Sequence, residues 1–346
     1  MKKMLGLLFA LVILCAGSTA MAEREFHLGV PYDGLTVVME KINWSTYILH
    51  GFLNTDGELF TGDWEDGMTS IGGYAAVRSN GKYGFINTAG ELVIPYEWDD
   101  VRFFREGLVA VQKDGKWGFL NGAGELVIPC QWNYCSYGFI NGLARVSNED
   151  GGGRYYFIDQ AGEVVLTVTS ANMGNGFYDG LAYISRDGMY GYIDREGKMV
   201  IPFQWEYATD FHNGTAMVKR SGLWYCIDVN GEILFCYEAL RGCDNWWKPY
   251  EGIMRVKFGG LQGFMNQQGE MVIPCEWTTA DDFREGVARV MNGDGWGVID
   301  RTGTLIIPCE YDNIVYGNGY YFLVKDAVIT IVDSDMNVTG VCDLRN

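Results

Sequence analysis

The sequence is short of the residues and motifs on which most catalytic sites are built. It has three histidines in 346 residues, and the G-x-S-x-G, HExxH and phosphate-loop motifs are absent from it. His27 lies near the N-terminus, His50 fills a position that other parts of the chain give to an aromatic residue, and His212 occupies a variable position. We therefore expect a protein that is not an enzyme and has no catalytic residue.

The residues that bind metals are present, but not in the spacing of a metal site. The CxxC pairs of zinc and redox sites are missing. Asp333-x-Asp335-x-Asn337 resembles a calcium loop, yet it lacks the glycine and the distal glutamate of such a loop. We expect neither a metal nor a cofactor.

Basic residues are scarce as well. The chain has 26 Lys and Arg against 44 Asp and Glu, a formal net charge of −18, and removing Lys2 and Lys3 with the leader described next takes it to about −20. Proteins bind nucleic acids and anionic membranes by neutralising phosphates with Lys and Arg, so both are excluded as partners. Solubility is the simplest role for the charge, and attraction to a cationic partner or to calcium is the alternative.

Residues 1–22 have the pattern of a secretory signal peptide. Lys2 and Lys3 precede an apolar run from Leu5 to Ala16, and Ala20-Met21-Ala22 forms a cleavage site of small residues. The apolar run is shorter than the ~20 residues that a membrane span needs, and no later stretch could span a membrane. We expect a mature chain that begins near Glu23 and is secreted or held in the cell envelope.

One sequence segment recurs along the mature chain, as in GKYGFINTAGELVIPYEW at 81–98 and GKWGFLNGAGELVIPCQW at 115–132. Eight copies at 23–311 share a turn glycine every 33 to 38 residues: Gly57, Gly90, Gly124, Gly162, Gly197, Gly231, Gly269 and Gly303. An eroded ninth copy within 312–346 has lost the aromatic–glycine pair, and we expect it to be a C-terminal cap. Such self-similarity is typical of a repeat array.

Within a copy, the pattern predicts three short strands. GLVAV at 107–111, WGFL at 117–120 and ELVIP at 125–129 are apolar, aromatic or β-branched runs, and NGAG at 121–124 separates the last two as a turn. Gly or Pro recurs too often for helices. The expected fold is all-β, an array of three-stranded antiparallel meanders of about 35 residues each.

These copies resemble the bacterial WG-containing repeat family, which is marked by Trp-Gly, an aliphatic or aromatic pair, Asp or Asn, a turn glycine and Val-Ile-Pro. The resemblance covers about 32 to 311 and implies a β-repeat architecture without catalytic residues. The chain departs from the pattern at the Trp or Gly position in several copies: His50, Tyr83, Tyr155, Tyr156, Tyr190, Tyr225 and Gln262.

The array could be an open superhelix or a closed propeller. A closed ring usually builds one blade from both ends of the chain, whereas the last copy here supplies all of its own strands. We therefore predict the open superhelix, and a monomer.

The repeated aromatic and cysteine positions favour packing roles. Trp117, Trp224 and Trp296 occupy the Trp position of the repeat, and a second aromatic position follows the proline by three residues, so we expect both sets to form a core between copies. Four cysteines share the position directly after that proline or its equivalent, where other copies have Tyr or Phe, so we expect mostly free thiols: Cys130, Cys275, Cys309 and Cys342. Cys130–Cys135 and Cys236–Cys243 are the local disulfides that the sequence allows.

Two function classes fit this pattern. The first is a non-enzymatic, secreted or surface-associated scaffold that binds a peptide, a protein or a glycan. The second is an extracellular hydrolase of glycosidase type, using Asp99-Asp100 or Asp281-Asp282, although these pairs recur at one loop position and suit turns better. A purely structural spacer is the third possibility.

The ligand-binding candidates lie two residues before the first-strand glycine of their copy. This position varies while its neighbours are constant, so repetition would align its side chains along one edge of the array. Arg and Tyr are enriched in contact surfaces, and an exposed loop that is free to vary is the alternative. The candidates are Arg105, Tyr178, His212, Tyr250 and Arg284.

The two groups of positions predict different costs of substitution. Trp117→Ala removes a packed ring and should cost ~3 kcal/mol or more of the free energy of unfolding, whereas Arg105→Ala should be nearly neutral. Denaturant unfolding of both variants measures this difference. Comparable losses in the unfolding midpoint would show that core and surface positions have been exchanged.

Overall fold

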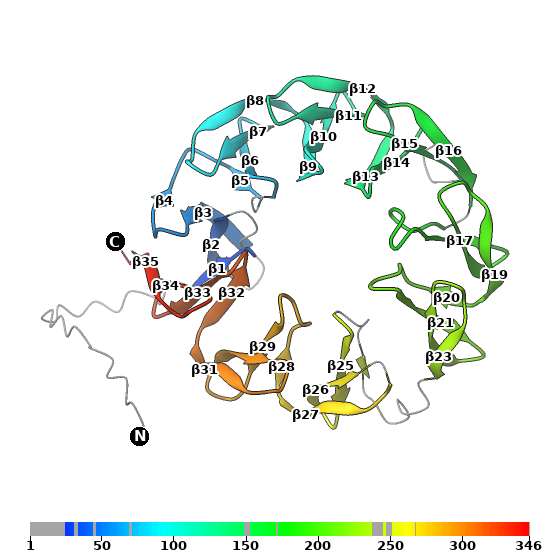
Figure 1. Cartoon of the computed structure of the whole chain (residues 1–346). Coiled ribbons are helices and arrows are strands. Elements are labelled where there is room, and N and C mark those ends of the chain that lie inside the picture. Colours follow the sequence, from blue (N-terminus) through cyan, green and yellow to red (C-terminus); the bar gives the residue numbers. More distant parts are fainter. Residues whose placement is uncertain are drawn as a thin grey trace, which may run out of the picture.

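The computed structural model describes residues 25–30, 34–43, 46–68, 71–148, 153–170, 172–236, 245–246, 251–266 and 268–345. Within these ranges the chain forms nine antiparallel sheets, which stand as blades 1 to 9 around a closed ring (Figure 1). Eight of them are four-stranded meanders, and in blade 5 a single bridge from Met173 to Ile184 takes the place of the first strand. No helix in the described ranges is long and apolar enough to cross a membrane. The expected leader at 1–22 lies outside the described residues.

The first strand of each blade lies nearest the centre of the ring, and the second pairs with it from outside (Figure 1). The first strands are β1 (Glu25–Leu28), β5 (Asp66–Gly67), β9 (Asp100–Arg105), β13 (Tyr134–Ile140), β20 (Tyr207–Ala208), β24 (Asn245–Trp246), β28 (Thr279–Ala280) and β32 (Asn313–Gly317). The second strands are β2 (Leu35–Asn43), β6 (Tyr74–Ser79), β10 (Leu108–Lys113), β14 (Leu143–Ser147), β17 (Ala182–Arg186), β21 (Thr215–Arg220), β25 (Ile253–Phe258), β29 (Val287–Met291) and β33 (Tyr320–Lys325).

The third strand carries the aromatic–glycine pair, and the fourth forms the outer rim of the ring (Figure 1). The third strands are β3 (Thr46–Asn54), β7 (Lys82–Asn87), β11 (Lys116–Asn121), β15 (Arg154–Ile158), β18 (Met189–Ile193), β22 (Leu223–Asp228), β26 (Leu261–Asn266), β30 (Trp296–Asp300) and β34 (Val328–Asp333). The fourth strands are β4 (Leu59–Phe60), β8 (Leu92–Trp98), β12 (Leu126–Trp132), β16 (Val164–Thr169), β19 (Met199–Trp205), β23 (Ile233–Cys236), β27 (Met271–Trp277), β31 (Leu305–Tyr311) and β35 (Val338–Asp343).

Two kinds of turn repeat from blade to blade. The first and second strands are joined by two residues with positive φ, such as Glu106 (53°) and Gly107 (80°), as in a type I′ hairpin. The third and fourth strands are joined by a turn in which an Asn or Asp side chain accepts two backbone hydrogen bonds; Asn121 Oδ1 takes those of Ala123 and Glu125, both at 3.0 Å. This is the D/N-x-x-G segment of the sequence.

The glycine after the aromatic residue allows the third and fourth strands to approach closely. In blade 3, a Cβ at Gly118 would lie 2.5 Å from the carbonyl oxygen of Ile128, where the register shifts at a bulge. The aromatic residues beside this contact are buried: Trp117 is 4% exposed, and Trp132, at the end of the fourth strand, is 7% exposed. The predicted packing role of these rings is confirmed for both.

The hydrophobic core lies between successive blades. Phe119 of blade 3 meets Phe139 of blade 4 with ring centroids 4.9 Å apart, and an equivalent aromatic pair joins several other neighbours. Each blade therefore buries one face against the blade before it and the other against the blade after it.

The ring closes through the same joint that connects its other blades. The turn between the third and fourth strands of one blade lies on the fourth strand of the preceding blade, as Gly124 does on Ile94. At the closure, Gly57 of blade 1 lies on Gly340 and Val341 of blade 9, and Thr339 Oγ1 donates to the carbonyl of Thr55 at 2.9 Å. Side chains of blades 1 and 9 also share one buried cluster.

The predicted open superhelix of three-stranded meanders is therefore wrong, and the chain is a closed nine-blade β-propeller. The last blade does supply all of its own strands. The ring still closes, because blades 1 and 9 pack face to face and do not need to share a strand. The first strand of each blade escaped prediction, because in several blades it has only two residues, too few for a pattern. Residues 312–346, expected to be a cap without a neighbour, contain blade 9, which packs on blade 1.

The described cysteines are free thiols, as predicted, and lie buried or half-buried: Cys130, Cys135, Cys226, Cys236, Cys275, Cys309 and Cys342. Cys130 and Cys135 form no local bridge, and Cys243 lies outside the described residues. Burial raises the pKa of the Cys226 thiol to about 11.

The contact between blades 1 and 9 can be tested by giving Gly340 the side chain that the repeat most often has at this position. Gly340 stands where five of the other blades have Ile, and a Cβ there would lie 2.5 Å from backbone atoms of Asp56 and Gly57. Gly340→Ile should therefore cost about 2 to 3 kcal/mol or more of the free energy of unfolding, although it makes blade 9 more like the others. Val338→Ile on the same strand, at a 62% exposed position, is the matched control and should stay within ~0.5 kcal/mol. A neutral Gly340→Ile in denaturant unfolding would show that blades 1 and 9 do not meet in solution.

Candidate functional site

The candidate binding residues occupy one structural position, at the start of the turn between the first and second strands. In an antiparallel meander this turn shares one face of the ring with the turn between the third and fourth strands, so we call this face the AB face. Arg105 and Arg284 are exposed on it, and Tyr178 and His212 are half-buried. Tyr250 lies outside the described residues.

Neighbouring blades bring two of these side chains together. The rings of Tyr178 and His212 lie 5.3 Å apart between centroids, at a tilt of 51°. At the same position of blade 4, Ile140 is 7% exposed and lies against Gly176. The side chain at this position is thus exposed at Arg105 and Arg284 but buried at Ile140, so in some blades the position still takes part in packing.

The acidic residue next in sequence holds adjacent turns together. Glu251 accepts the backbone hydrogen bonds of Glu285 (2.7 Å) and Gly286 (3.1 Å) from the next blade, and the Arg301 guanidinium donates to it at 2.8 Å. Equivalent bonds run from Gly142 to Glu106 and from Gly214 to Asp179, both at 2.8 Å. The candidate side chains therefore project from a hydrogen-bonded ring of turns.

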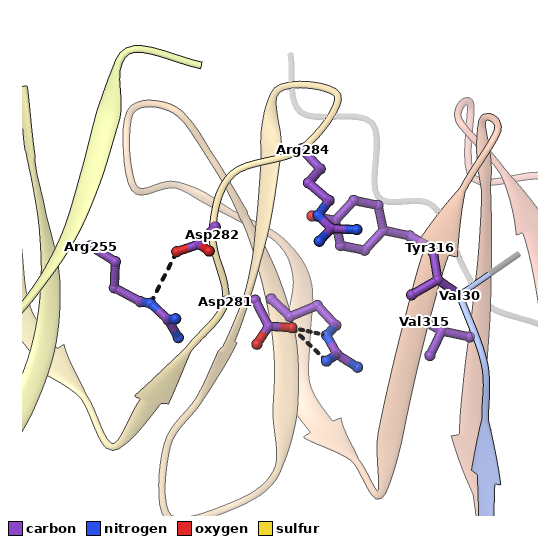
Figure 2. Close-up of a pocket in the computed structure, with 8 residues that line it drawn as sticks. Val30, Arg255, Asp281, Asp282, Arg284, Val315 and Tyr316 are labelled. Carbon is purple, nitrogen blue, oxygen red and sulfur yellow. Dashed lines mark hydrogen bonds and ion pairs between the residues drawn. The ribbon is translucent and has the colours of Figure 1, made fainter. Parts of the chain in front are cut away.

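Beneath Arg284, a pocket of about 230 Å³ opens between blades 7, 8 and 9 (Figure 2). Its polar side chains come from the second strands of blades 7 and 8 and from the segment after β28. Val30, from the segment before β2, completes its wall. The lining residues are Val30, Arg255, Asp281, Asp282, Arg284, Arg289, Val315 and Tyr316; we call this the Arg284 pocket.

Two ion pairs fix the side chains inside the Arg284 pocket (Figure 2). Arg255 Nε lies 3.2 Å from Asp282 Oδ1, and Arg289 donates from Nε (2.6 Å) and Nη2 (2.5 Å) to Asp281 Oδ2. The Arg289 guanidinium also lies over the ring of Trp296, 4.9 Å from its centroid. With Arg284 as the third guanidinium, the lining has three positive charges against two negative ones.

Tyr316 closes the pocket on the blade 9 side. Its hydroxyl donates to the carbonyl of Val287 at 2.9 Å. Burial and the nearby Asp281 carboxylate raise the pKa of this phenol far above its ordinary value, while Arg284 and Arg289 oppose the rise. Tyr316 is therefore a neutral wall of the pocket at physiological pH.

The acidic pairs considered for hydrolysis are engaged in structural contacts. Each carboxylate of Asp281-Asp282 is paired with its own arginine. Asp99 pairs with Lys82 and accepts the backbone hydrogen bond of Asp114 at 2.7 Å, contacts that hold the pKa of its carboxyl below the ordinary value. Carboxylates bonded in this way suit turns and the positioning of arginines.

The segment that resembles a calcium loop is one of the repeated turns. Asp333 Oδ1 accepts the backbone hydrogen bonds of Asp335 (3.0 Å) and Asn337 (2.8 Å), as Asn121 does in blade 3. Over the part of the chain that the structure describes, no three His, Cys, Asp or Glu side chains are grouped so that they could hold a metal ion.

Sequence reasoning missed Arg255, Arg289 and Tyr316. A signal for the arginines was present, because the third residue after the first-strand glycine is apolar in several copies, as Ala76, Ala110 and Met217. Arginine at this buried position breaks the repeat in blades 7 and 8. Tyr316 had no such signal, since it lies in the copy whose pattern is most eroded.

Comparison with protein families gives one match. The family model described as the WG containing repeat matches five stretches of the chain: residues 83–117, 117–151, 190–224, 263–296 and 296–327. No curated protein matches the sequence.

A solved structure shares the fold at low sequence identity. A crystal structure of a eukaryotic initiation factor has a TM-score of 0.57 at 10% identity, covering 92% of this chain and 95% of that one. Kluyveromyces lactis Hsv2p (TM-score 0.38, 9% identity, 80% of this chain and 96% of that one) and BamB from Moraxella catarrhalis (0.36, 14%, 92% and 91%) are more distant. At such identities the likeness shows the fold alone.

The contacts of Glu251 predict a pH-dependent contribution to stability. Burial alone would raise the pKa of this carboxyl, but hydrogen bonds from Arg301, Gly286 and Glu285 lower it below its ordinary value of 4.5. Because the folded pKa lies below the unfolded one, the contribution is complete well above pH 4.5 and is lost as the pH falls through the folded pKa.

Glu251→Gln should thus cost about 1 kcal/mol of the free energy of unfolding at pH 7 and less at pH 3. Denaturant midpoints measured at both pH values check this, with Glu276→Gln, at an exposed position on β27, as the control. A cost that is equal at pH 7 and pH 3 would contradict the assignment.

Proposed function

The chain is a member of the WG containing repeat family, and on that premise we propose that it is an exported, non-enzymatic scaffold that binds a segment of another protein on the AB face. A nine-blade ring presents many turns in a fixed arrangement, and the hydrogen bonds between adjacent turns hold the arrangement. A preformed surface loses little entropy on binding. The leader at 1–22 is the basis for export, to the envelope or the medium.

The Arg284 pocket is the observation that carries the proposal. Three guanidinium groups converge there in a chain of net charge −18, and two of them are held by carboxylates and by an aromatic ring. Arg and Tyr dominate the energetics of protein interfaces because they combine large contact area with directed hydrogen bonds. The pocket thus suits an acidic or amide-rich peptide segment.

The proposal is tested with a peptide array probed by the chain from residue 23 onward. Arg105→Ser, Tyr178→Ser, His212→Ser and Arg284→Ser combined should leave the unfolding midpoint nearly unchanged, because none of these side chains is fully buried, and should weaken binding to retained peptides at least tenfold.

The control removes two positive charges from the opposite face of the ring. Lys113→Ser with Lys116→Ser changes the turn between the second and third strands of blade 3 and should leave peptide binding intact. If no peptide is retained, or if both variants bind like the parent chain, the proposed AB-face scaffold is wrong.

A further inference from the structure

Three arginines at one repeat position point to a second binding site, on the far side of the ring from the Arg284 pocket. Arg145, Arg255 and Arg289 are each the third residue after the first-strand glycine of their copy, which is Gly142, Gly252 and Gly286 in turn. Each donates a hydrogen bond to a backbone carbonyl of the next blade: Arg145 to Met173 (2.9 Å), Arg255 to Ala280 and Arg289 to Ile314. The three guanidiniums are therefore held in the same way.

The charge partners of these arginines differ. Two residues after Ala280, Asp282 gives Arg255 a carboxylate at 3.2 Å. Two residues after Met173, the chain has Asn175, whose Oδ1 accepts from Arg145 Nη2 at 3.0 Å. An amide thus stands at Arg145 where a carboxylate stands at Arg255.

Arg145 consequently carries a buried charge whose hydrogen-bond partners are all neutral groups. The residue is 6% exposed, and its other contacts are the hydroxyl of Tyr134 at 3.1 Å and the rings of Tyr134 and Tyr155. Among the described residues no carboxylate forms an ion pair with it, and its buried Nε has no hydrogen-bond partner. Burial and the Asp210 carboxylate raise the pKa of the nearby Tyr183 phenol, and Arg145 opposes this rise. A buried charge without an opposite charge is costly, so a ligand that supplies one is favoured.

A pocket of about 330 Å³ opens along the first strands of blades 3 and 4, and its lining includes Tyr134 and Asn175, which bond to this guanidinium. Its lining residues are Met68, Val101, Arg102, Phe103, Tyr134, Cys135, Ser136, Tyr137 and Asn175, and we call it the Arg145 pocket. Met68, Val101 and Phe103 give it an apolar wall.

The polar side chains of the Arg145 pocket are set to donate hydrogen bonds. Because the Tyr134 oxygen and Asn175 Oδ1 both accept from Arg145, the Tyr134 hydroxyl hydrogen and the Asn175 amide hydrogens remain to donate. Arg102 adds a guanidinium that lies over Trp117, 4.2 Å from the ring centroid, and pairs with Asp100 at 3.0 Å. The Ser136 hydroxyl, in contrast, is buried and faces the backbone carbonyl of Asn175.

Blade 4 departs from the repeat at this pocket. In β9, two residues between Val101 and Phe104 stand opposite one residue of β10, whereas in β13 three residues between Cys135 and Phe139 stand opposite Arg145. The additional residue leaves the ring of Tyr137 52% exposed at the pocket.

We propose that the Arg145 pocket binds the C-terminal carboxylate of a peptide whose last side chain is apolar. The carboxylate receives the hydrogen bonds of Tyr134, Asn175 and Arg102 and compensates Arg145, while the apolar side chain packs on Met68, Val101 and Tyr137. A sugar fits less well, because its hydroxyls need acceptors as well as donors. The inference rests on the proposed role as a peptide-binding scaffold and adds the chemical group that is recognised.

The test compares acetyl-Gly-Gly-Phe carrying a free carboxylate with the same peptide as its amide, by titration calorimetry. The parent chain should bind the acid at least tenfold more tightly than the amide. Asn175→Asp copies the Arg255–Asp282 pair, so it should abolish this preference and raise the thermal midpoint, since the buried charge is then compensated within the chain.

Two further variants separate binding from folding. Tyr137→Ala, at an exposed position, should weaken the acid peptide several-fold and keep the preference for acid over amide. Tyr207→Ala, on the first strand of blade 6 and 47% exposed, is the matched control and should change nothing.

Equal affinity for acid and amide would overturn the carboxylate site while leaving the AB-face scaffold in place, and so would failure of both peptides to bind. Equal or tighter binding of galacturonate, or an Asn175→Asp chain that keeps its preference for the acid, would overturn it too.

Discussion

The structure depends on one contact that is repeated around the ring, between the turn of one blade and the outer strand of the blade before it. A glycine turn such as Gly124 lies on a fourth-strand isoleucine such as Ile94, and aromatic pairs fill the space beneath. A single blade cannot bury both of its faces, so each becomes stable only between two neighbours. Closing the ring gives the first and last blades the same two neighbours as the rest, which removes the exposed ends that an open array would have.

Closure also explains why the last copy has drifted from the repeat. Blade 9 supports the turn of blade 1, whose backbone comes nearer than any side chain at Gly340 would allow. At Gly340, therefore, the departure from the repeat is required by the neighbouring blade.

The arginines show how the same framework produces chemically different sites. The position three residues after the first-strand glycine is filled by Ala110 or Met217 where it serves the core alone. Arginine at this position carries a charge into the joint between two blades, where the next blade fixes it through a backbone carbonyl. One residue of the following blade then decides how the charge is balanced. At Arg255 this residue is Asp282, which balances the charge within the chain. At Arg145 it is Asn175, and we infer that a ligand supplies the opposite charge.

The sequence was sufficient for the β-repeat and its core, but not for the closure or the sites. Trp117 and Gly118 allow the third strand to be predicted, because packing restricts which residues can stand at both positions. The Asn or Asp of each turn is restricted in the same way by the two backbone hydrogen bonds that it accepts. First strands such as β28, with two residues, carry no periodic signal. Closure depends on Gly340 and Thr339 meeting residues almost a whole chain length away, and the pockets depend on side chains from several blades, which no local pattern reveals. Arg105 and Arg284 were located by their variability, whereas Arg145 required knowledge of which residue faces it.

Small-angle X-ray scattering of the chain from residue 23 onward tests the central claim most directly. A closed ring of nine blades predicts a scattering curve that fits the structure, with a largest dimension equal to the ring's diameter. A distance distribution with a long tail beyond that diameter, as an open superhelix of the same blades would give, would contradict the closed ring and the joint between blades 1 and 9.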